Sequence, residues 1–288
     1  MDSVRWTRRA VLASLGLAAA GAAAAAGPLA APARAASGPN LDRLLATPGF
    51  FVAHRGGSLN WPEMSAYAYS RAVALGVGAL DVSLSRTSDG VWFGLHDGSL
   101  DRTSGTQGFT AAAHTWAEVA AYRITASGTS NPRQPKRPYA RLEDLLERWG
   151  GQRVLFVDPK AVNPRFHGEL VTALRRVPDA PRWIVAKSPI ANTTWADLAR
   201  REGWRSWGFY WAREVDADAT LLTRTAASWD LLGLDVGASD ARWTEVKALG
   251  KPVLAHILST PAQLQRALAL GAVGAVVSDL VAVPPTGA

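Results

Sequence analysis

From Gly49 onward, the chain alternates short, continuous apolar runs with longer stretches of helical pattern, separated by polar residues or by glycine and proline. The apolar runs are rich in β-forming residues and continuous, which we expect of strands buried on both faces of a sheet. Strands that alternate with helices form parallel sheets. Because the alternation recurs about eight times, we expect a closed TIM-type (β/α)₈ barrel.

One candidate strand is too many for such a barrel. The runs at residues 79–85 and 91–96 are joined only by Thr87-Ser88-Asp89-Gly90, which is too short for a crossover helix. Asp-Gly is a strong hairpin signal, so we expect a β-hairpin after the second strand, with Ser83 opposite His96. The candidate strands are residues 50–54, 79–85, 91–96, 153–158, 183–187, 206–211, 231–236, 252–257 and 273–279. The candidate helices are residues 63–75, 141–149, 164–177, 194–203, 240–249 and 261–270.

The composition fits one large folded domain. Of the 288 residues, 48% are hydrophobic and 19% are charged, which is enough to bury a sizeable core. Residues 97–139 are rich in glycine, serine and threonine and only partly helical, so we expect a small insertion over one end of the barrel. We assign residues 1–36 to an export signal, 37–48 to a linker and 49–288 to the barrel domain.

The N-terminal segment has the layout of a signal peptide. Thr7-Arg8-Arg9 leads into an uncharged run of mostly alanine and glycine, which ends at the small-residue pattern Ala33-Arg34-Ala35. The paired arginines resemble a twin-arginine signal and predict a secreted, periplasmic or cell-wall protein. The alternative is an uncleaved membrane anchor. Alanine and glycine are weakly hydrophobic, so we favour cleavage and expect no stable membrane span afterwards.

The net charge of +7 does not predict a nucleic-acid partner. Residues 1–36 hold four arginines and one aspartate, and the other basic residues are scattered apart from Arg133, Lys136 and Arg137. We therefore expect a solvated basic surface. The chain has no cysteine, which excludes a cysteine nucleophile, a thiolate zinc site and an iron–sulfur cluster. Any metal must be bound by carboxylates, histidines or hydroxyls.

Polar side chains gather where four predicted strands end. They lie in the segments Ala53–Gly57, Asp81–Ser83, Leu95–Asp97 and Phe156–Lys160. Active sites of barrels are built at the carboxyl ends of the strands, so these segments should meet. Basic groups can hold phosphate oxygens, a carboxylate-bound cation can neutralise charge, and histidine can move protons. The set therefore suits phosphodiester chemistry.

These motifs, in this order, resemble the glycerophosphodiester phosphodiesterase family over about residues 50–280. His54-Arg55-Gly56 followed by Pro62-Glu63-Met64-Ser65 resembles the HRG…PENT opening of that family. Further resemblances are Thr87–Gly90 with His96-Asp97, and the segments Leu100–Gly105, Leu142–Leu146 and Gly271–Asp279. The resemblance implies a TIM-type barrel that hydrolyses glycerophosphodiesters to sn-glycerol 3-phosphate and an alcohol.

The resemblance also implies roles for individual residues. His54 and His96 would act as general acid and base, and Arg55 and Lys160 would bind the phosphate. The metal-ligand positions fall at Asp81, Ser83 and Asp158, with Glu63 beside them. They depart from the E-x-D and E-x-K patterns of the family. A bound Ca²⁺ or Mg²⁺ would lose one negative charge and some ligand reach there, so the metal could also be absent.

Other positions leave alternatives open. His256 could contact the substrate or lie idle at the barrel rim. Asp97 could orient a neighbour or cap a loop, and Asp279 could hold Arg55 or Lys160. His114 and His167 fall in stretches that we expect to be exposed. The aromatic residues Trp204, Trp207, Tyr210 and Trp211 could line a pocket for a choline-like cation or pack in the core.

We expect a phosphodiesterase whose partner is a small glycerophosphodiester or a phospholipid head group. One alternative is a related phosphodiesterase that acts on membrane phospholipid. Another is a catalytically lapsed barrel that binds a phosphorylated ligand. The change at Ser83 favours the lapsed barrel, whereas the presence of His54, Arg55, His96 and Lys160 together argues against it.

Overall fold

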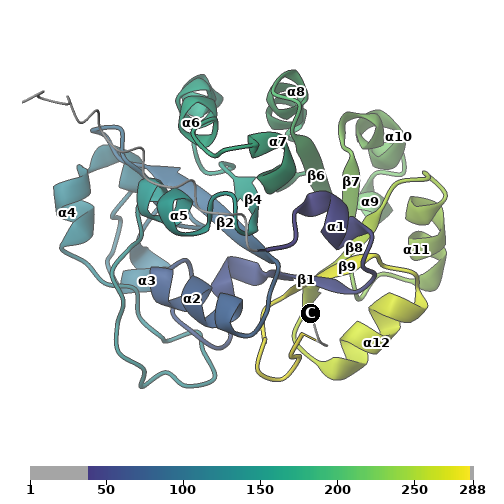
Figure 1. Cartoon of the computed structure of the whole chain (residues 1–288), viewed down its shortest axis with the longest axis horizontal. Coiled ribbons are helices and arrows are strands. Elements are labelled where there is room, and N and C mark those ends of the chain that lie inside the picture. Colours follow the sequence, from purple (N-terminus) through teal and green to yellow (C-terminus); the bar gives the residue numbers. More distant parts are fainter. Residues whose placement is uncertain (1–37, 286–288) are drawn as a thin grey trace, which may run out of the picture. The chain divides into compact units, whose positions relative to one another are not determined.

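The computed structural model describes residues 38–285, so the predicted signal peptide and most of the cleavage region lie outside the described residues. Eight parallel strands form a closed barrel, and a ninth pairs antiparallel with one of them (Figure 1). The strands are β1 (Phe50–Ala53), β2 (Ala79–Arg86), β3 (Trp92–Gly94), β4 (Val154–Asp158), β5 (Ile184–Pro189), β6 (Arg205–Tyr210), β7 (Leu231–Asp235), β8 (Val253–Leu258) and β9 (Gly274–Val277). The pairing of β1 with both β2 and β9 closes the barrel, which confirms the predicted fold.

Helices surround the strands as an outer ring (Figure 1). They are α1 (Leu41–Leu45), α2 (Ala66–Ala74), α3 (Asp101–Ser104), α4 (Trp116–Ala120), α5 (Leu142–Trp149), α6 (His167–Leu174), α7 (Ala180–Trp183), α8 (Thr193–Arg201), α9 (Ala212–Ala217), α10 (Leu221–Thr225), α11 (Asp240–Lys247) and α12 (Pro261–Ala269). Short 3₁₀ turns cover His54–Gly56, Ala111–Ala113, Pro164–Phe166 and Ala226–Ser228. Within residues 38–285, no helix is long and apolar enough to cross a membrane.

Side-chain caps explain where several helices begin. The Ser65 hydroxyl accepts a hydrogen bond from the Ala68 N–H at the start of α2, and Ser239 caps α11 in the same way. Thr260 and Gln263 form a capping box at α12, where Pro261 takes the first turn. The predicted helix at residues 63–75 was too long, because residues 62–64 form a loop whose Met64 N–H donates to the Arg55 carbonyl.

The hairpin of β2 and β3 is present, but its predicted register is wrong by one residue. Leu84 pairs with Gly94, so Ser83 faces Leu95 rather than His96. The reason lies in the loop, which is closed by Thr87. Its N–H donates to the Val91 carbonyl, and its hydroxyl accepts from the Val91 N–H. The loop is therefore one residue longer than a turn centred between Asp89 and Gly90.

Large side chains fill the barrel interior, and small residues next to them leave the space that they need. Trp207 of β6 is fully buried beside Phe156 of β4, with 5.7 Å between the ring centroids. A Cβ atom on Gly233 of β7 would lie 2.5 Å from the Trp207 ring, so glycine is needed there. At the other end of the strands, Leu44 of α1 packs against Gly78. Aromatic rings and glycine thus fill this part of the barrel interior.

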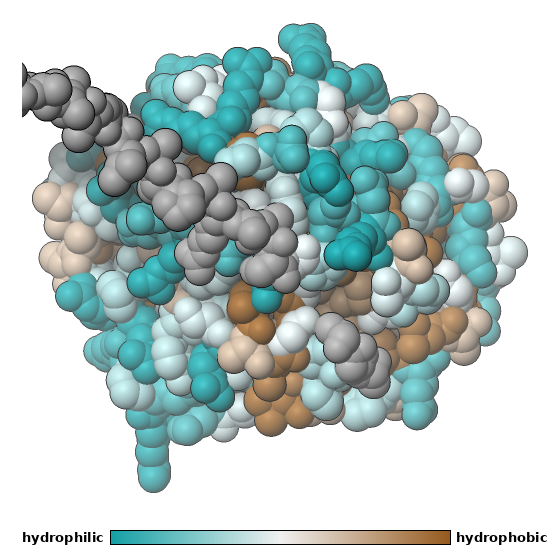
Figure 2. Space-filling model, in the orientation of Figure 1, coloured by the Kyte–Doolittle hydropathy of each residue, from teal (hydrophilic) through white to brown (hydrophobic). Residues whose placement is uncertain are grey.

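The insertion between β3 and α5 has a hydrophobic cluster of its own. Phe93, Leu100, Val119 and Tyr139 are buried together there, apart from the main core. The surface view in Figure 2 shows a largely hydrophilic face on which hydrophobic residues occupy smaller areas. The insertion therefore forms a packed part of the domain rather than a free loop.

Candidate active site

His54 lies directly after β1 and is buried, with 6% of its surface exposed. Its Nδ1 forms a 2.6 Å hydrogen bond with the hydroxyl of Ser278, which follows β9, and Ser58 approaches the same nitrogen at 3.3 Å. The Nε2 atom lies 3.9 Å from the Oδ2 atom of Asp81. The ring is thus held through Nδ1, which leaves Nε2 to exchange a proton.

Arg55 has a left-handed backbone, with φ of 51°, and Gly56 and Gly57 continue the positive φ values. Such a conformation is costly for a residue with a side chain and is often found at functional sites. The Arg55 Nη1 donates to the Oε2 of Glu63 at 3.2 Å. The turn therefore holds a guanidinium immediately beside His54.

His96 is held by a chain of ion pairs. Its Nδ1 lies 2.7 Å from Oδ1 of Asp97, whose Oδ2 accepts a 2.7 Å hydrogen bond from Nε of Arg102. Arg102 also donates to both oxygens of Glu63, at 3.0 and 2.7 Å. Asp97 therefore orients His96, and Glu63 bridges Arg102 and Arg55. Sequence reasoning assigned no role to Arg102, although the motif that contains it was recognised.

The bottom of the site holds two buried carboxylates and a buried ammonium. Asp81 of β2 and Asp158 of β4 are fully buried, and Lys187 of β5 is 3% exposed. The Lys187 Nζ donates to Oδ1 of Asp81 at 2.6 Å and lies 3.9 Å from Oδ2 of Asp158. Lys160 donates to that Asp158 oxygen at 3.0 Å. Sequence reasoning missed Lys187, although a lysine inside a buried apolar strand was a visible signal.

Burial and nearby cations keep both histidines neutral. Burial lowers the pKa of His54 well below 6.5, and the charges of Arg55 and Lys187 lower it further. Burial also lowers the pKa of His96, although its hydrogen bond to Asp97 opposes the shift. Burial raises the pKa of Glu63, but its hydrogen bond from Arg102 and the charge of Arg55 outweigh this, so the net shift is downward. Two neutral imidazoles thus share a site with ionised carboxylates and cations.

The comparisons with known proteins place these residues in one family. The model of the glycerophosphoryl diester phosphodiesterase family matches residues 54–279, from His54 through the last strand. The chain belongs to this family. A glycerophosphodiester phosphodiesterase of Bacillus subtilis is 28% identical over 158 residues, which cover 50% of this chain and 51% of that protein. The glycerophosphodiester phosphodiesterase of Caldanaerobacter subterraneus is 40% identical over 58 residues, 20% of this chain and 24% of that protein.

Solved structures agree on the fold. An Oleispira antarctica phosphodiesterase, in complex with the product sn-glycerol-3-phosphate, superposes with a TM-score of 0.65 at 18% identity. The match covers 82% of this chain and 95% of that one. The chain spans about half the length of the Bacillus relative that it matches and about a quarter of the other relative. The family assignment thus rests on the family model, and the solved structure supports the barrel.

The residues present do not fit the divalent cation that the family resemblance implies. Asp81, Asp158 and Glu63 each already contact a lysine or arginine, and Ca²⁺ needs six to eight oxygen ligands. Among these residues, only Oδ2 of Asp81 and the Ser83 hydroxyl are buried without a hydrogen-bond partner. Within residues 38–285, no three His, Asp or Glu side chains are grouped to hold a metal ion. Glu63 serves the two arginines instead.

His256 is nearer to the core than the sequence suggested. It is buried on β8 against the rings of Phe209 and Trp211, with centroids 4.6 and 4.7 Å away. Burial, helped by the charge of Lys187, lowers its pKa to about 3. The nearby Lys187 ammonium itself lies over the rings of Trp207 and Phe209, at 5.8 and 5.6 Å. These aromatic residues therefore pack around a cation of the protein.

Two smaller expectations are wrong. His167 was expected to be exposed, but it is buried at the start of α6 against Trp195 of α8, which covers β4. Asp279 was offered as a support for Arg55 or Lys160, but it accepts a 2.7 Å hydrogen bond from Asn60 instead. His114 is half-buried and stacks on Phe109 at 3.8 Å. His167 and Asp279 are each placed by a neighbour distant in sequence, whereas His114 packs on a residue of its own segment.

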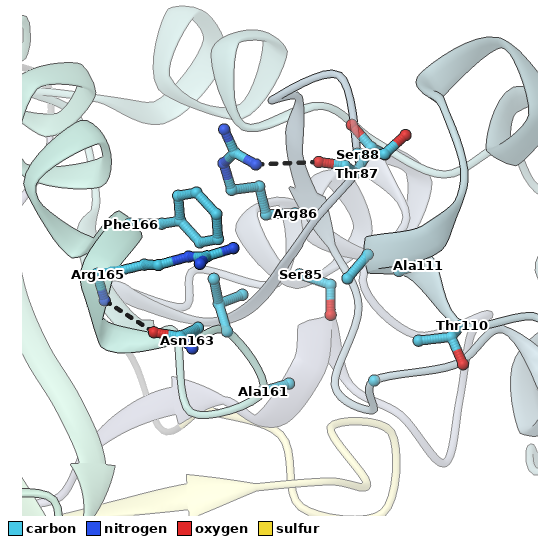
Figure 3. Close-up of a pocket in the computed structure, with 13 residues that line it drawn as sticks. Ser85, Arg86, Thr87, Ser88, Thr110, Ala111, Ala161, Asn163, Arg165 and Phe166 are labelled. Carbon is cyan, nitrogen blue, oxygen red and sulfur yellow. Dashed lines mark hydrogen bonds between the residues drawn. The ribbon is translucent and has the colours of Figure 1, made fainter.

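Two hollows adjoin the family site. One, of about 340 Å³, lies between the end of β2, the insertion and the loop after β4, and is lined by Arg86, Arg165 and Phe166 (Figure 3). Its wall includes Gly98 and Ala161, the residues that follow Asp97 and Lys160 in sequence. The other, of about 200 Å³, includes Ser58, Glu63 and Arg102 in its lining. Of these two hollows, the second is therefore the one that the ion-paired residues Glu63 and Arg102 line.

The buried histidines make stability depend on pH. The unfolded chain takes up a proton at His256 near pH 6.5, whereas the folded chain resists it down to about pH 3. The contribution of such a histidine to the free energy of unfolding is therefore fully present above pH 6.5. It is lost as the pH falls below that value, by about 1.4 kcal/mol per pH unit. We expect His256→Phe to reduce the slope of the free energy of unfolding against pH by about that amount, measured by urea unfolding between about pH 7 and 5. An unchanged slope would contradict the neutral, buried state of His256.

Proposed function

We propose that the chain hydrolyses glycerophosphodiesters to sn-glycerol 3-phosphate and an alcohol. The carrying observation is a connected set of hydrogen bonds and ion pairs that joins Arg55 to His96 at the carboxyl ends of the strands. His54 lies beside Arg55 in sequence and is held separately, by the hydroxyl of Ser278. The family model begins at His54, and relatives with that activity match the chain in sequence. No contact among the described residues favours a phospholipid-specific enzyme or a catalytically lapsed binding barrel over this function.

The residues divide the chemistry between them. Arg55 and Lys160 donate hydrogen bonds to the phosphate oxygens and offset the charge that develops on them. One neutral imidazole accepts a proton from the attacking water as the water oxygen bonds to phosphorus. The other histidine first takes up a proton from solvent, and as the imidazolium it gives this proton to the alcohol oxygen as the bond of that oxygen to phosphorus breaks. The two histidines are held differently, His54 by Ser278 and His96 by Asp97, and these supports fix the direction of each ring.

The test is release of sn-glycerol 3-phosphate from glycerophosphocholine by the purified chain. We expect turnover with the wild-type chain and a large loss in Arg55→Met, because this change removes a phosphate-binding charge. Phospholipid vesicles serve as a second substrate. Release from vesicles alone would favour the lipid-specific enzyme, and binding of sn-glycerol 3-phosphate without turnover on either substrate would favour the lapsed barrel.

We also propose that the chain is exported with a twin-arginine signal. The support is the sequence of Thr7-Arg8-Arg9 and the cleavage pattern at Ala33-Arg34-Ala35. Mass spectrometry of the exported protein should find an N-terminus near Ala36. Replacing Arg8 and Arg9 by lysine should leave the full-length chain inside the cell. Export of the doubly substituted chain at the normal level would contradict the proposal.

A further inference from the structure

Lys187 of β5 lies beside acidic residues of two neighbouring strands, β2 and β4. Its Nζ lies 2.6 Å from Asp81 of β2 and 3.9 Å from Asp158 of β4. The Asp158 Oδ1 also accepts a 3.3 Å hydrogen bond from Ser188, the next residue on β5. A single strand thus supplies both a cation and a hydroxyl to carboxylates that the family resemblance would assign to a metal ion.

The surroundings pair this ammonium with a carboxylate and hold it in place. An ion buried in a protein needs a partner of opposite charge, and Lys187 has Asp81 in direct contact. Burial lowers the pKa of Lys187, and the charges of Asp81 and Asp158 offset only part of this, so the net shift is downward. Burial raises the pKa of Asp81, but the charge and hydrogen bond of Lys187 outweigh it and the net shift is downward. The Lys187 ammonium also lies over the rings of Trp207 and Phe209, 5.8 and 5.6 Å from their centroids.

A divalent ion between the same carboxylates would face strong repulsion. Lys187 and Lys160 both contact Asp158, and Lys187 also contacts Asp81, so an added cation would lie beside two ammonium groups. Like charges at such distances repel strongly where water is excluded. The uncharged Ser83, at the position where the family pattern has an aspartate, removes a further negative charge. The ammonium groups of Lys187 and Lys160 therefore already balance the negative charges of Asp81 and Asp158.

We propose that the Lys187 ammonium is the permanent cation of this site and replaces the divalent metal ion between Asp81 and Asp158. Lys187 then acts as a positioning residue, because it holds the carboxylate whose other oxygen faces Nε2 of His54 at 3.9 Å. The catalytic consequence rests on the proposed function. Turnover should need neither Ca²⁺ nor Mg²⁺.

Calorimetric titration of the metal-stripped wild-type chain with CaCl₂ and with MgCl₂ tests the proposal without any substrate. We expect no saturable binding with a Kd below about 100 μM, and no rise in melting temperature in millimolar salt. One Ca²⁺ or Mg²⁺ bound per chain below that Kd, and lost in Asp81→Asn, would overturn the proposal.

Lys187→Met removes the charge and keeps the length of the side chain. We expect this variant to bind Ca²⁺ and to melt at a higher temperature with CaCl₂ than without it, because Asp81 and Asp158 lose their buried cation. Lys251→Met is the matched control, since Lys251 is a half-buried lysine just before β8 that donates to the Ala226 carbonyl at 2.7 Å. A folded Lys187→Met that responds to Ca²⁺ no more than the control would count against the proposal. If the variant does not fold, the wild-type titration decides.

Activity measurements separate this proposal from the proposed function. We expect turnover of glycerophosphocholine to be the same in EDTA, CaCl₂ and MgCl₂. Turnover that is lost in EDTA and restored by either metal would overturn the role of Lys187 while supporting the hydrolysis. Absence of turnover under every condition would refute the hydrolysis alone, because the titration reports on Lys187 without it.

Discussion

His54→Ala is expected to lower kcat for glycerophosphodiester hydrolysis by about 10²–10⁴-fold. His54 is held through Nδ1 by Ser278, and its free Nε2 lies at the base of the site. Alanine removes the group that carries the proton and leaves Arg55 and Lys160 to bind the phosphate. The measurement is steady-state release of sn-glycerol 3-phosphate, and we expect a smaller change in KM than in kcat.

A matched control is available on the insertion. His114→Ala removes an imidazole that stacks on Phe109 and lies 3.4 Å from Glu118. Neither of these contacts involves an ion-paired residue of the active site. We expect its kcat to equal that of the wild type. Rates near wild type in both His54→Ala and His96→Ala would rule out the histidines as proton carriers, whatever the effect of His114→Ala.

Trp207→Ala is expected to lower the free energy of unfolding by about 3–5 kcal/mol. The ring is fully buried inside the barrel, next to Phe156 and His256 and over the glycine at position 233. Its removal leaves a cavity that the closed ring of strands cannot collapse to fill. Urea unfolding followed by far-UV circular dichroism measures the loss.

The control for this change is Leu268→Ala on α12, where the side chain is 43% exposed. We expect it to alter the free energy of unfolding by less than about 0.5 kcal/mol. An equal loss in both variants would show that the stability of the barrel does not depend on the packing of its interior.

Within residues 38–285, the strands and half of the α-helices could be predicted because their signals are local. Most strands are short runs dominated by apolar residues, and the hairpin turn is marked by Asp89-Gly90. The register of the hairpin could not be predicted from the dipeptide, since the Thr87 side chain extends the loop by one residue. Short helices such as α9 and α10 were missed because their sequences lack a clear apolar period.

The site could be predicted only where family motifs carry it. His54, Arg55 and His96 belong to such motifs. The structure links Arg55 to His96 by hydrogen bonds and ion pairs and holds His54 separately, through Ser278. Lys187 could not be found in this way, since its partner Asp81 lies 106 residues earlier and the contact exists only once β2, β4 and β5 are adjacent. Pairing of distant strands therefore creates the most unusual feature of the site.

The hydrogen bond between His54 and Ser278 determines at which stage of folding activity can appear. The two residues are 224 positions apart and meet only when β9 docks beside β1. Contacts that close such long loops are the slow ones in folding, whereas the hairpin forms early. A nascent or truncated chain that lacks the last strand and Ser278 loses the 2.6 Å anchor of His54 and keeps only the longer contact with Ser58. During refolding, turnover should therefore return only when the barrel closes between β9 and β1. Spectroscopic signals of helix content should recover before turnover does.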